Sequence, residues 1–170
     1  MPSMDFGTPT TYEYSDGDVS ISSLPFNSNK DFIALSINNK SDLDIHTIKE
    51  PNIKIIESFG IYKNGTPAGE ISLWSELDAQ RTIPSLSYWI DKEQRRQGVA
   101  TKAVELAIKH CFSVLDVEEV RAHATVDNQA SKGLLAKFGF GTIFYTELKT
   151  KTGPKLFTVY ELLRSDNANL

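Results

Sequence analysis

The clearest change of hydrophobic pattern lies in the middle of the chain. Leu86–Ile90 is an apolar run rich in aromatic and β-branched side chains, which predicts a buried strand. A polar segment, 91–97, and Gly98 follow it, and apolar residues then recur at steps of three and four over Val99–Val114, the spacing of an amphipathic helix. We therefore expect a strand that passes through a glycine-containing loop into the N-terminus of a helix.

The same changes of period divide the rest of the chain. Asn64-Gly65 between two strand-like runs predicts a hairpin. The predicted order is strand 19–24, short helices within 29–39 and 41–52, strands 53–62, 68–74 and 86–90, helix 99–114, strand 117–126, helix 129–138, and strands 141–148 and 155–163. This order predicts a mixed α/β layered domain over residues 19–164, with a flexible N-terminal arm at 1–18 and a C-terminal tail at 165–170.

Composition narrows the classes of function. The 170 residues are 40% hydrophobic, enough for one domain with its own core, and the net charge of −4 contains no block of like charge. We expect no nucleic-acid partner, and no membrane partner because no apolar stretch approaches about 18 residues. The one cysteine, Cys111, cannot form an internal disulfide, which agrees with a cytoplasmic location. Three scattered histidines predict no metal site.

The loop before the helix has the chemistry of a phosphate site. The first turn of a helix carries unpaired N–H groups and the positive end of the helix dipole, and Gly98 allows close approach to the backbone. Arg95 and Arg96 add positive charge beside these donors. The alternative is a turn glycine next to solvated arginines. No G-x-G-x-x-G or G-K-[ST] pattern indicates a dinucleotide or nucleoside triphosphate.

Two motifs carry a resemblance to a known family. Arg95-Arg96-Gln97-Gly98-Val99-Ala100 resembles the R/Q-x-x-G-x-G/A signature of GNAT-type N-acetyltransferases. Asn128–Phe140 resembles the N-x-x-S-x-x-L-L-x-K-x-G-F segment of the branch that includes the bacterial ribosomal-protein N-terminal acetyltransferases, as does Tyr88-Trp89-Ile90. The resemblance covers residues 19–163. A helix cap at Asn128 and a helix end at Gly139 explain part of the second motif without any ligand.

The resemblance implies a fold, a co-substrate and a set of contacts. The fold is the GNAT acyl-CoA N-acyltransferase fold, with a mixed central sheet and helices on both faces, and the co-substrate is acetyl-CoA. By this resemblance, the main chain of Trp89 and Ile90 pairs with the pantetheine arm, and Asn128 contacts the same arm. The pyrophosphate is held by the loop residues Arg95, Arg96, Gln97, Gly98, Val99, Ala100 and Thr101.

Acyl transfer to an amine also needs proton chemistry, and here the chain departs from the family pattern. Many members use a tyrosine on the last helix to protonate the leaving thiolate, but this region reads Leu134-Leu135. Ser131 of the second motif is the favoured donor, with Tyr145 as the alternative. The glutamate that often precedes the Tyr-Trp strand is also missing, so Glu70 on the preceding predicted strand is the nearest acid for a general base.

The sequence therefore predicts an N-acetyltransferase that transfers the acetyl group of acetyl-CoA to a primary amine by direct attack in a ternary complex. The acceptor is an amine-bearing small molecule or a protein N-terminus, and the sequence does not choose between them. The missing tyrosine and glutamate motivate an alternative, a non-catalytic acyl-CoA-binding sensor or scaffold. Monomer and homodimer are both left open.

Overall fold

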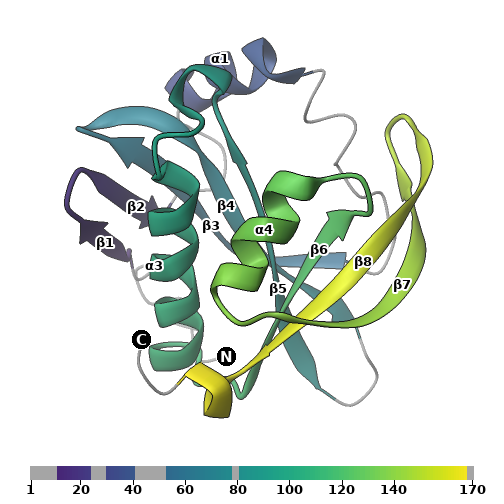
Figure 1. Cartoon of the computed structure of the whole chain (residues 1–170). Coiled ribbons are helices and arrows are strands. Elements are labelled where there is room, and N and C mark those ends of the chain that lie inside the picture. The colour runs from purple at the N-terminus through teal and green to yellow at the C-terminus, as the bar shows by residue number, and fades with distance from the viewer. Residues whose placement is uncertain (1–10, 24–29, 41–52, 78–80, 168–170) are drawn as a thin grey trace, which may run out of the picture.

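The computed structural model describes residues 11–23, 30–40, 53–77 and 81–167 (Figure 1). The strands are β1 (Glu13–Asp16), β2 (Val19–Ser23), β3 (Ile53–Lys63), β4 (Thr66–Leu77), β5 (Thr82–Ile90), β6 (Glu119–Thr125), β7 (Gly141–Thr150) and β8 (Gly153–Leu163). The helices are α1 (Lys30–Asn38), α3 (Val99–Ser113) and α4 (Gln129–Lys137), with short 3-10 turns η1 (Lys92–Gln94) and η2 (Arg164–Asn167). The short helix expected within 41–52 lies outside the described residues.

The strands form one mixed sheet in the order β1-β2-β3-β4-β5-β6-β8-β7. Every neighbouring pair is antiparallel except β5 and β6, which are parallel. Helices α3 and α4 lie in front of the sheet in Figure 1, whereas α1 lies apart from them at its upper end, against β4. The mixed layered fold expected from the sequence is confirmed.

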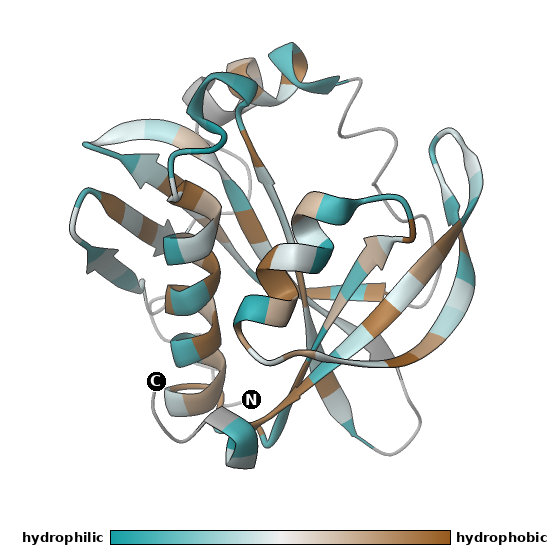
Figure 2. Cartoon of the chain, viewed as in Figure 1, coloured by the Kyte–Doolittle hydropathy of each residue, from teal (hydrophilic) through white to brown (hydrophobic). Residues whose placement is uncertain are grey.

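The core lies between the sheet and helix α3. One face of this helix is buried: Ala103, Val104, Ala107 and Ile108 are fully buried, whereas Lys109 and Ser113 are exposed. Hydrophobic and hydrophilic stretches accordingly alternate along the ribbon of α3 in Figure 2. Burial of a valine or isoleucine side chain contributes about 1.5–3 kcal/mol, so this one face accounts for much of the attachment of the helix. Among the described residues, no helix is long and apolar enough to cross a membrane.

Glu13–Asp16, which the sequence placed in a flexible N-terminal arm, forms β1 and pairs with β2. The Tyr14 hydroxyl lies 2.7 Å from Nδ1 of His110, a fully buried residue of α3, and the other ring nitrogen of His110 contacts the Glu57 carboxylate. The polar sequence of β1 has no strand pattern of its own. Its position depends on these contacts with distant residues.

The hairpin predicted at Asn64-Gly65 is confirmed. It joins β3 to β4, and both turn residues have positive φ, 48° and 76°. A two-residue turn of this type needs positive φ at both central positions, which asparagine and glycine adopt at least cost.

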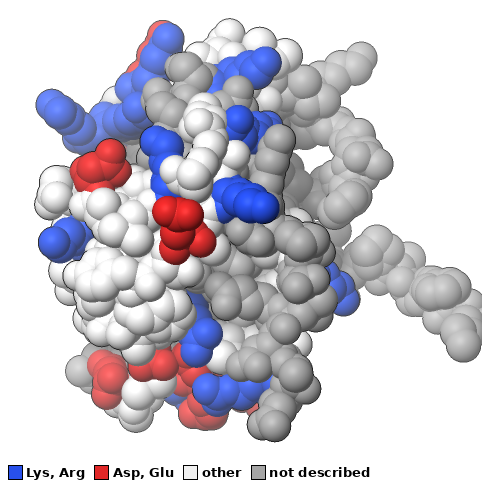
Figure 3. Space-filling model, turned by 90° about the vertical axis from the view of Figure 1, so that its right-hand side faces the viewer, with Lys and Arg blue, Asp and Glu red and all other residues white. Residues whose placement is uncertain are grey.

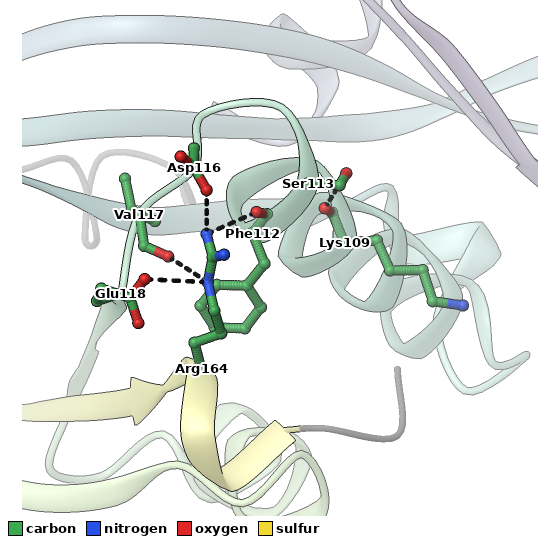
Figure 4. A network of polar contacts seen from close by, with 7 residues as sticks. All are labelled: Lys109, Phe112, Ser113, Asp116, Val117, Glu118 and Arg164. Atoms are coloured by element: carbon green, nitrogen blue, oxygen red, sulfur yellow. Dashed lines mark hydrogen bonds and ion pairs between the residues drawn. The ribbon is translucent and has the colours of Figure 1, made fainter.

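The end of β8 is fastened to helix α3 by Arg164 (Figure 4). Its guanidinium donates to the carbonyl oxygens of Phe112 at 2.8 Å and Val117 at 3.0 Å, and it pairs with Asp116 at 2.9 Å. Phe112 lies in the last turn of α3, where carbonyl groups have no partner within the helix. Residues 165–167, which the sequence placed in a C-terminal tail, belong to η2.

We predict that Arg164→Ala lowers the free energy of unfolding by about 1–3 kcal/mol, because hydrogen bonds to a charged donor are lost and the Phe112 carbonyl loses its partner. Arg164→Lys recovers only part of the loss, since an ammonium group cannot reproduce the planar fork of donors. Urea unfolding of the intact protein and the two variants measures the effect, and the three m-values should agree. A loss under about 0.5 kcal/mol for Arg164→Ala would mean that the network does not stabilise the fold.

Candidate active site

A cleft of about 1120 Å³ opens where β5 and β6 separate. The two strands pair only through Ser85 with Arg121 and Leu86 with Ala122, and beyond these pairs they diverge. From Ser87 to Ile90, β5 therefore has no β6 partner for its backbone groups. Such groups can form hydrogen bonds with an extended ligand that lies along the strand.

The loop after β5 borders one end of the cleft and is held in place by buried polar contacts. Asp91 is buried and accepts a hydrogen bond of 2.8 Å from the Asn39 side chain, and its backbone N–H donates to the Ala68 carbonyl. Arg95 donates through Nε to the Ile90 carbonyl at 2.9 Å. These bonds fix the path of the chain from the strand to the helix.

Gly98 is the N-cap of α3, at φ 77°, and no side chain caps the helix. A Cβ atom at Gly98 would meet nothing within 4 Å, so the space beside the first turn of the helix is open. The unpaired N–H groups of this turn and the positive end of the helix dipole face an anion that enters there. The first turn of α3 thus offers donors and space to an anion, and the pyrophosphate contact stays a prediction.

Most of the loop residues predicted to hold the pyrophosphate line the cleft. They are Arg95, Arg96, Gly98, Val99, Ala100 and Thr101. Gln97 does not: its side chain donates to the Glu93 carbonyl at 2.9 Å and accepts from Lys63 outside the cleft. The left-handed conformation of Arg96, at φ 59°, gives the loop a sharp turn at this point.

The charge of the cleft is opposite to that of the whole chain. Of the charged residues described in its lining, Arg95, Arg96, Lys137 and Lys155 are basic and Asp127 is acidic. In Figure 3, lysine and arginine side chains gather over the upper half of the face that carries the β7–β8 hairpin. A net-negative protein with a basic cleft suits a polyanionic ligand.

The second motif lies across the cleft, at the start of α4. Asn128 is the N-cap, and its Oδ1 accepts the backbone N–H of Ser131 at 3.1 Å. The cap uses only Oδ1, so the side-chain NH₂ group is the part of Asn128 that can donate to a ligand. Asn128 and Ser131 both line the cleft, together with Trp89 and Ile90. Their contacts with the cofactor stay predictions.

The two remaining catalytic expectations lie outside the cleft lining. Glu70 is half-buried on β4, pairs across the sheet with Trp89, and accepts a hydrogen bond of 3.1 Å from Ser72, which does line the cleft. Tyr145 lies on β7 with 65% of its surface exposed and is not brought to the cleft. Only Glu70 therefore has a link to the site.

From the sequence, Tyr88 has no expected role beyond its place in the motif. Its hydroxyl donates to the Ser131 side chain at 3.2 Å, and burial raises the pKa of this hydroxyl. Strand alternation indicates the direction of this side chain, because Leu86, Tyr88 and Ile90 share one face of β5. Leu86 and Ile90 are part of the core on the helix side of the sheet. Which helical residue Tyr88 meets depends on the packing of α4.

A mixed sheet that opens between two parallel strands, with a glycine-capped helix at one end of the opening, defines the class of the acyl-CoA acyltransferases. Residues 24–141 match the acetyltransferase (GNAT) domain, and the chain belongs to this family, which implies acyltransferase activity and binding of acetyl-CoA or CoA. The family predicted from the two motifs is confirmed.

Comparison with individual proteins agrees with the family. A protein of Bacillus subtilis named as a ribosomal N-acetyltransferase, YdaF, is 32% identical over 48% of this chain, and the match spans 44% of that relative, less than half its length. The solved structure of Mycobacterium smegmatis RimJ in complex with CoA-disulfide has a TM-score of 0.72 and 13% identity, over 86% of this chain and 83% of the other. The solved structure of a spermidine/spermine N-acetyltransferase of Vibrio cholerae has a TM-score of 0.67 and 14% identity, over 89% of this chain and 97% of the other.

Gly69 of β4 pairs with Ile90, a residue of β5 that lines the cleft. A Cβ atom at Gly69 of β4 would stand 2.1 Å from the backbone oxygen of Trp89. Gly69→Ala therefore displaces β5 at the cleft, and we expect it to lower the free energy of unfolding by about 3 kcal/mol and to weaken binding of CoA. Denaturant unfolding and calorimetry measure the two effects.

The matched control for this change is Gly141→Ala on β7, where an added Cβ meets nothing within 4 Å. We expect Gly141→Ala to keep both stability and binding. If Gly69→Ala behaves like the control, the close approach of β4 to Trp89 does not determine the shape of the cleft.

Proposed function

We propose that the protein transfers the acetyl group of acetyl-CoA to a primary amine by direct attack within a ternary complex. One observation carries the proposal: the cleft reaches both faces of the sheet. Tyr88 and Ser131 line it on the face that bears α3 and α4. Ser72 and Trp74 also line it, and they alternate along β4 with Ile71 and Leu73 of the helix-side core. Two substrates can thus meet from opposite sides.

The helix-side half suits the co-substrate. The N-terminal turn of α3 with Arg95 and Arg96 would hold the pyrophosphate, and the free edge of β5 would pair with the pantetheine arm. Bound there, acetyl-CoA supplies the activated acetyl group. The backbone N–H groups of β5 in the opening are the available donors for the carbonyl oxygen as negative charge builds on it.

The opposite half suits the amine, which must be neutral when it attacks. We assign Glu70 as the general base, acting through Ser72. Ser72 donates its proton to Glu70 and lies in the cleft, so its oxygen is able to accept a proton from the amine or from a water molecule. Three apolar side chains border this half, Ile53, Ile55 and Trp74, and they suit an amine with an apolar neighbour.

Ser131 is the proposed donor to the leaving thiolate, since it lies in the cleft and Tyr145 does not. A donor in the cleft supports catalysis, and the relatives are named as acetyltransferases, so the non-catalytic module is not favoured. Those names include both a ribosomal and a polyamine enzyme, and the acceptor proposed here remains a protein N-terminus or a small-molecule amine.

The first test is binding of acetyl-CoA, measured by calorimetry. We expect the double variant Arg95→Ala, Arg96→Ala to lose at least about 10-fold in affinity, because hydrogen bonds from charged donors to the pyrophosphate are removed. Lys109→Ala, which removes a positive charge farther along α3, is the control and should bind like the intact protein. Failure of the intact protein to bind would overturn both the transferase and the binding-module hypotheses.

The second test measures turnover by the Ser131→Ala variant with a panel of amines. Release of CoA reports the rate. We expect kcat to fall by about 100-fold, because the departing thiolate loses the hydrogen bond from Ser131, and a hydrogen bond to a charged group contributes about 1.5–3 kcal/mol. Affinity for acetyl-CoA should be kept. Tyr145→Phe is measured in parallel: if its kcat falls and that of Ser131→Ala does not, the two assignments must be exchanged.

A further inference from the structure

Tyr88 connects the central strand to the helix that carries the proposed donor. Its side chain leaves β5 on the helix side of the sheet, is half-buried, and lines the cleft. Its hydroxyl donates to Oγ of Ser131 at 3.2 Å. The two residues are 43 positions apart in the chain, so the contact between their hydroxyl groups depends on the fold and not on local sequence.

The hydrogen bonding of Ser131 differs from that of a serine elsewhere on a helix. Ser113 of α3 donates its proton back to the Lys109 carbonyl, four residues earlier, at 2.6 Å, as helical serines commonly do. Ser131 is the third residue after the Asn128 cap, and its oxygen accepts a proton from Tyr88. Because a hydroxyl group has one proton, Ser131 keeps its own for a partner in the cleft.

We propose that Tyr88 is a positioning residue, which orients Ser131 so that the chain Tyr88–Ser131 donates a hydrogen bond to the sulfur atom of the departing CoA. The inference rests on the proposed function and deepens it. A hydroxyl that accepts a hydrogen bond becomes a stronger donor, so the pair stabilises a thiolate better than Ser131 does alone.

The reaction step is balanced without a transfer of either hydroxyl proton. The bond between the amine nitrogen and the acetyl carbon forms, and the bond between carbon and sulfur breaks with its electron pair going to sulfur. The amine proton passes to the base and, through solvent, to the thiolate. Burial raises the pKa of Tyr88 above its ordinary value near 10, and a thiol titrates near 8.5, so Tyr88 stays protonated and acts as a donor throughout.

The test needs no acceptor amine, because it measures the thiol of bound CoA. The ultraviolet absorbance of the thiolate is followed against pH in the complex of CoA with the protein. We expect Tyr88→Phe to raise the pKa of the bound thiol by about 0.5 unit, and Ser131→Ala to raise it by about 1 unit. In the Ser131→Ala background, Tyr88→Phe should add no further shift.

Tyr14→Phe is the matched control, since it removes a tyrosine hydroxyl with a 2.7 Å contact to His110 and Tyr14 does not line the cleft. It should leave the pKa of the bound thiol unchanged, as a merely structural Tyr88 would. An unchanged thiol pKa in Tyr88→Phe overturns the inference. Ser131→Ala gives a second way to overturn it, because an unchanged thiol pKa there removes the donor to which Tyr88 is assigned.

The two proposals fail in different ways. If the pKa of the bound thiol shifts as expected but no amine is acetylated, the role of Tyr88 and Ser131 toward the thiol is supported and the proposed transfer is wrong. If the thiol pKa is the same in all variants while amines are acetylated, the transfer stands and the pair has no role. If intact protein does not bind CoA, both are overturned.

Discussion

The short parallel ladder between β5 and β6 is the constraint on which the rest of the site depends. Two residue pairs join these strands, and β5 is otherwise held by β4 while β6 is held by β8. Each strand is thus paired along its far edge, and the opening lies between two paired halves of the sheet. The cleft is a gap in the sheet, and backbone donors that a complete sheet would use internally remain available to a ligand.

The two helices that follow β5 and β6 begin at this opening, and their caps differ in a way that matters for ligands. The first turn of α3 is capped by Gly98, which has no side chain, so its N–H groups stay open to an anion from outside. In α4 the backbone N–H of Ser131 already donates to the Asn128 side chain, so this donor is not open to a ligand. The same feature of helix geometry therefore favours an external anion at one helix start and a fixed serine at the other.

Features that depend on neighbouring residues could be predicted from the sequence, and features that depend on packing could not. The Asn64-Gly65 turn, helix α3 and the Asn128 cap are local, and each appears where the pattern indicates. Strand β1 was missed because its polar residues gain order only from β2 and His110. Gln97 shares the motif of the loop, yet its side chain faces Lys63, a residue of a distant strand.

Register connects the sheet to the chemistry of the site. Side chains alternate along β5, so Tyr88 reaches Ser131 on the helix side while Trp89 pairs with Glu70 on the opposite side. A shift of β5 by one residue would exchange the two faces and place an indole where the tyrosine hydroxyl now donates. Only a glycine fits against the Trp89 carbonyl, so Gly69 permits the close approach of β4 to β5 in this register. A glycine outside the cleft lining is therefore part of the strand pairing in which Tyr88 reaches Ser131.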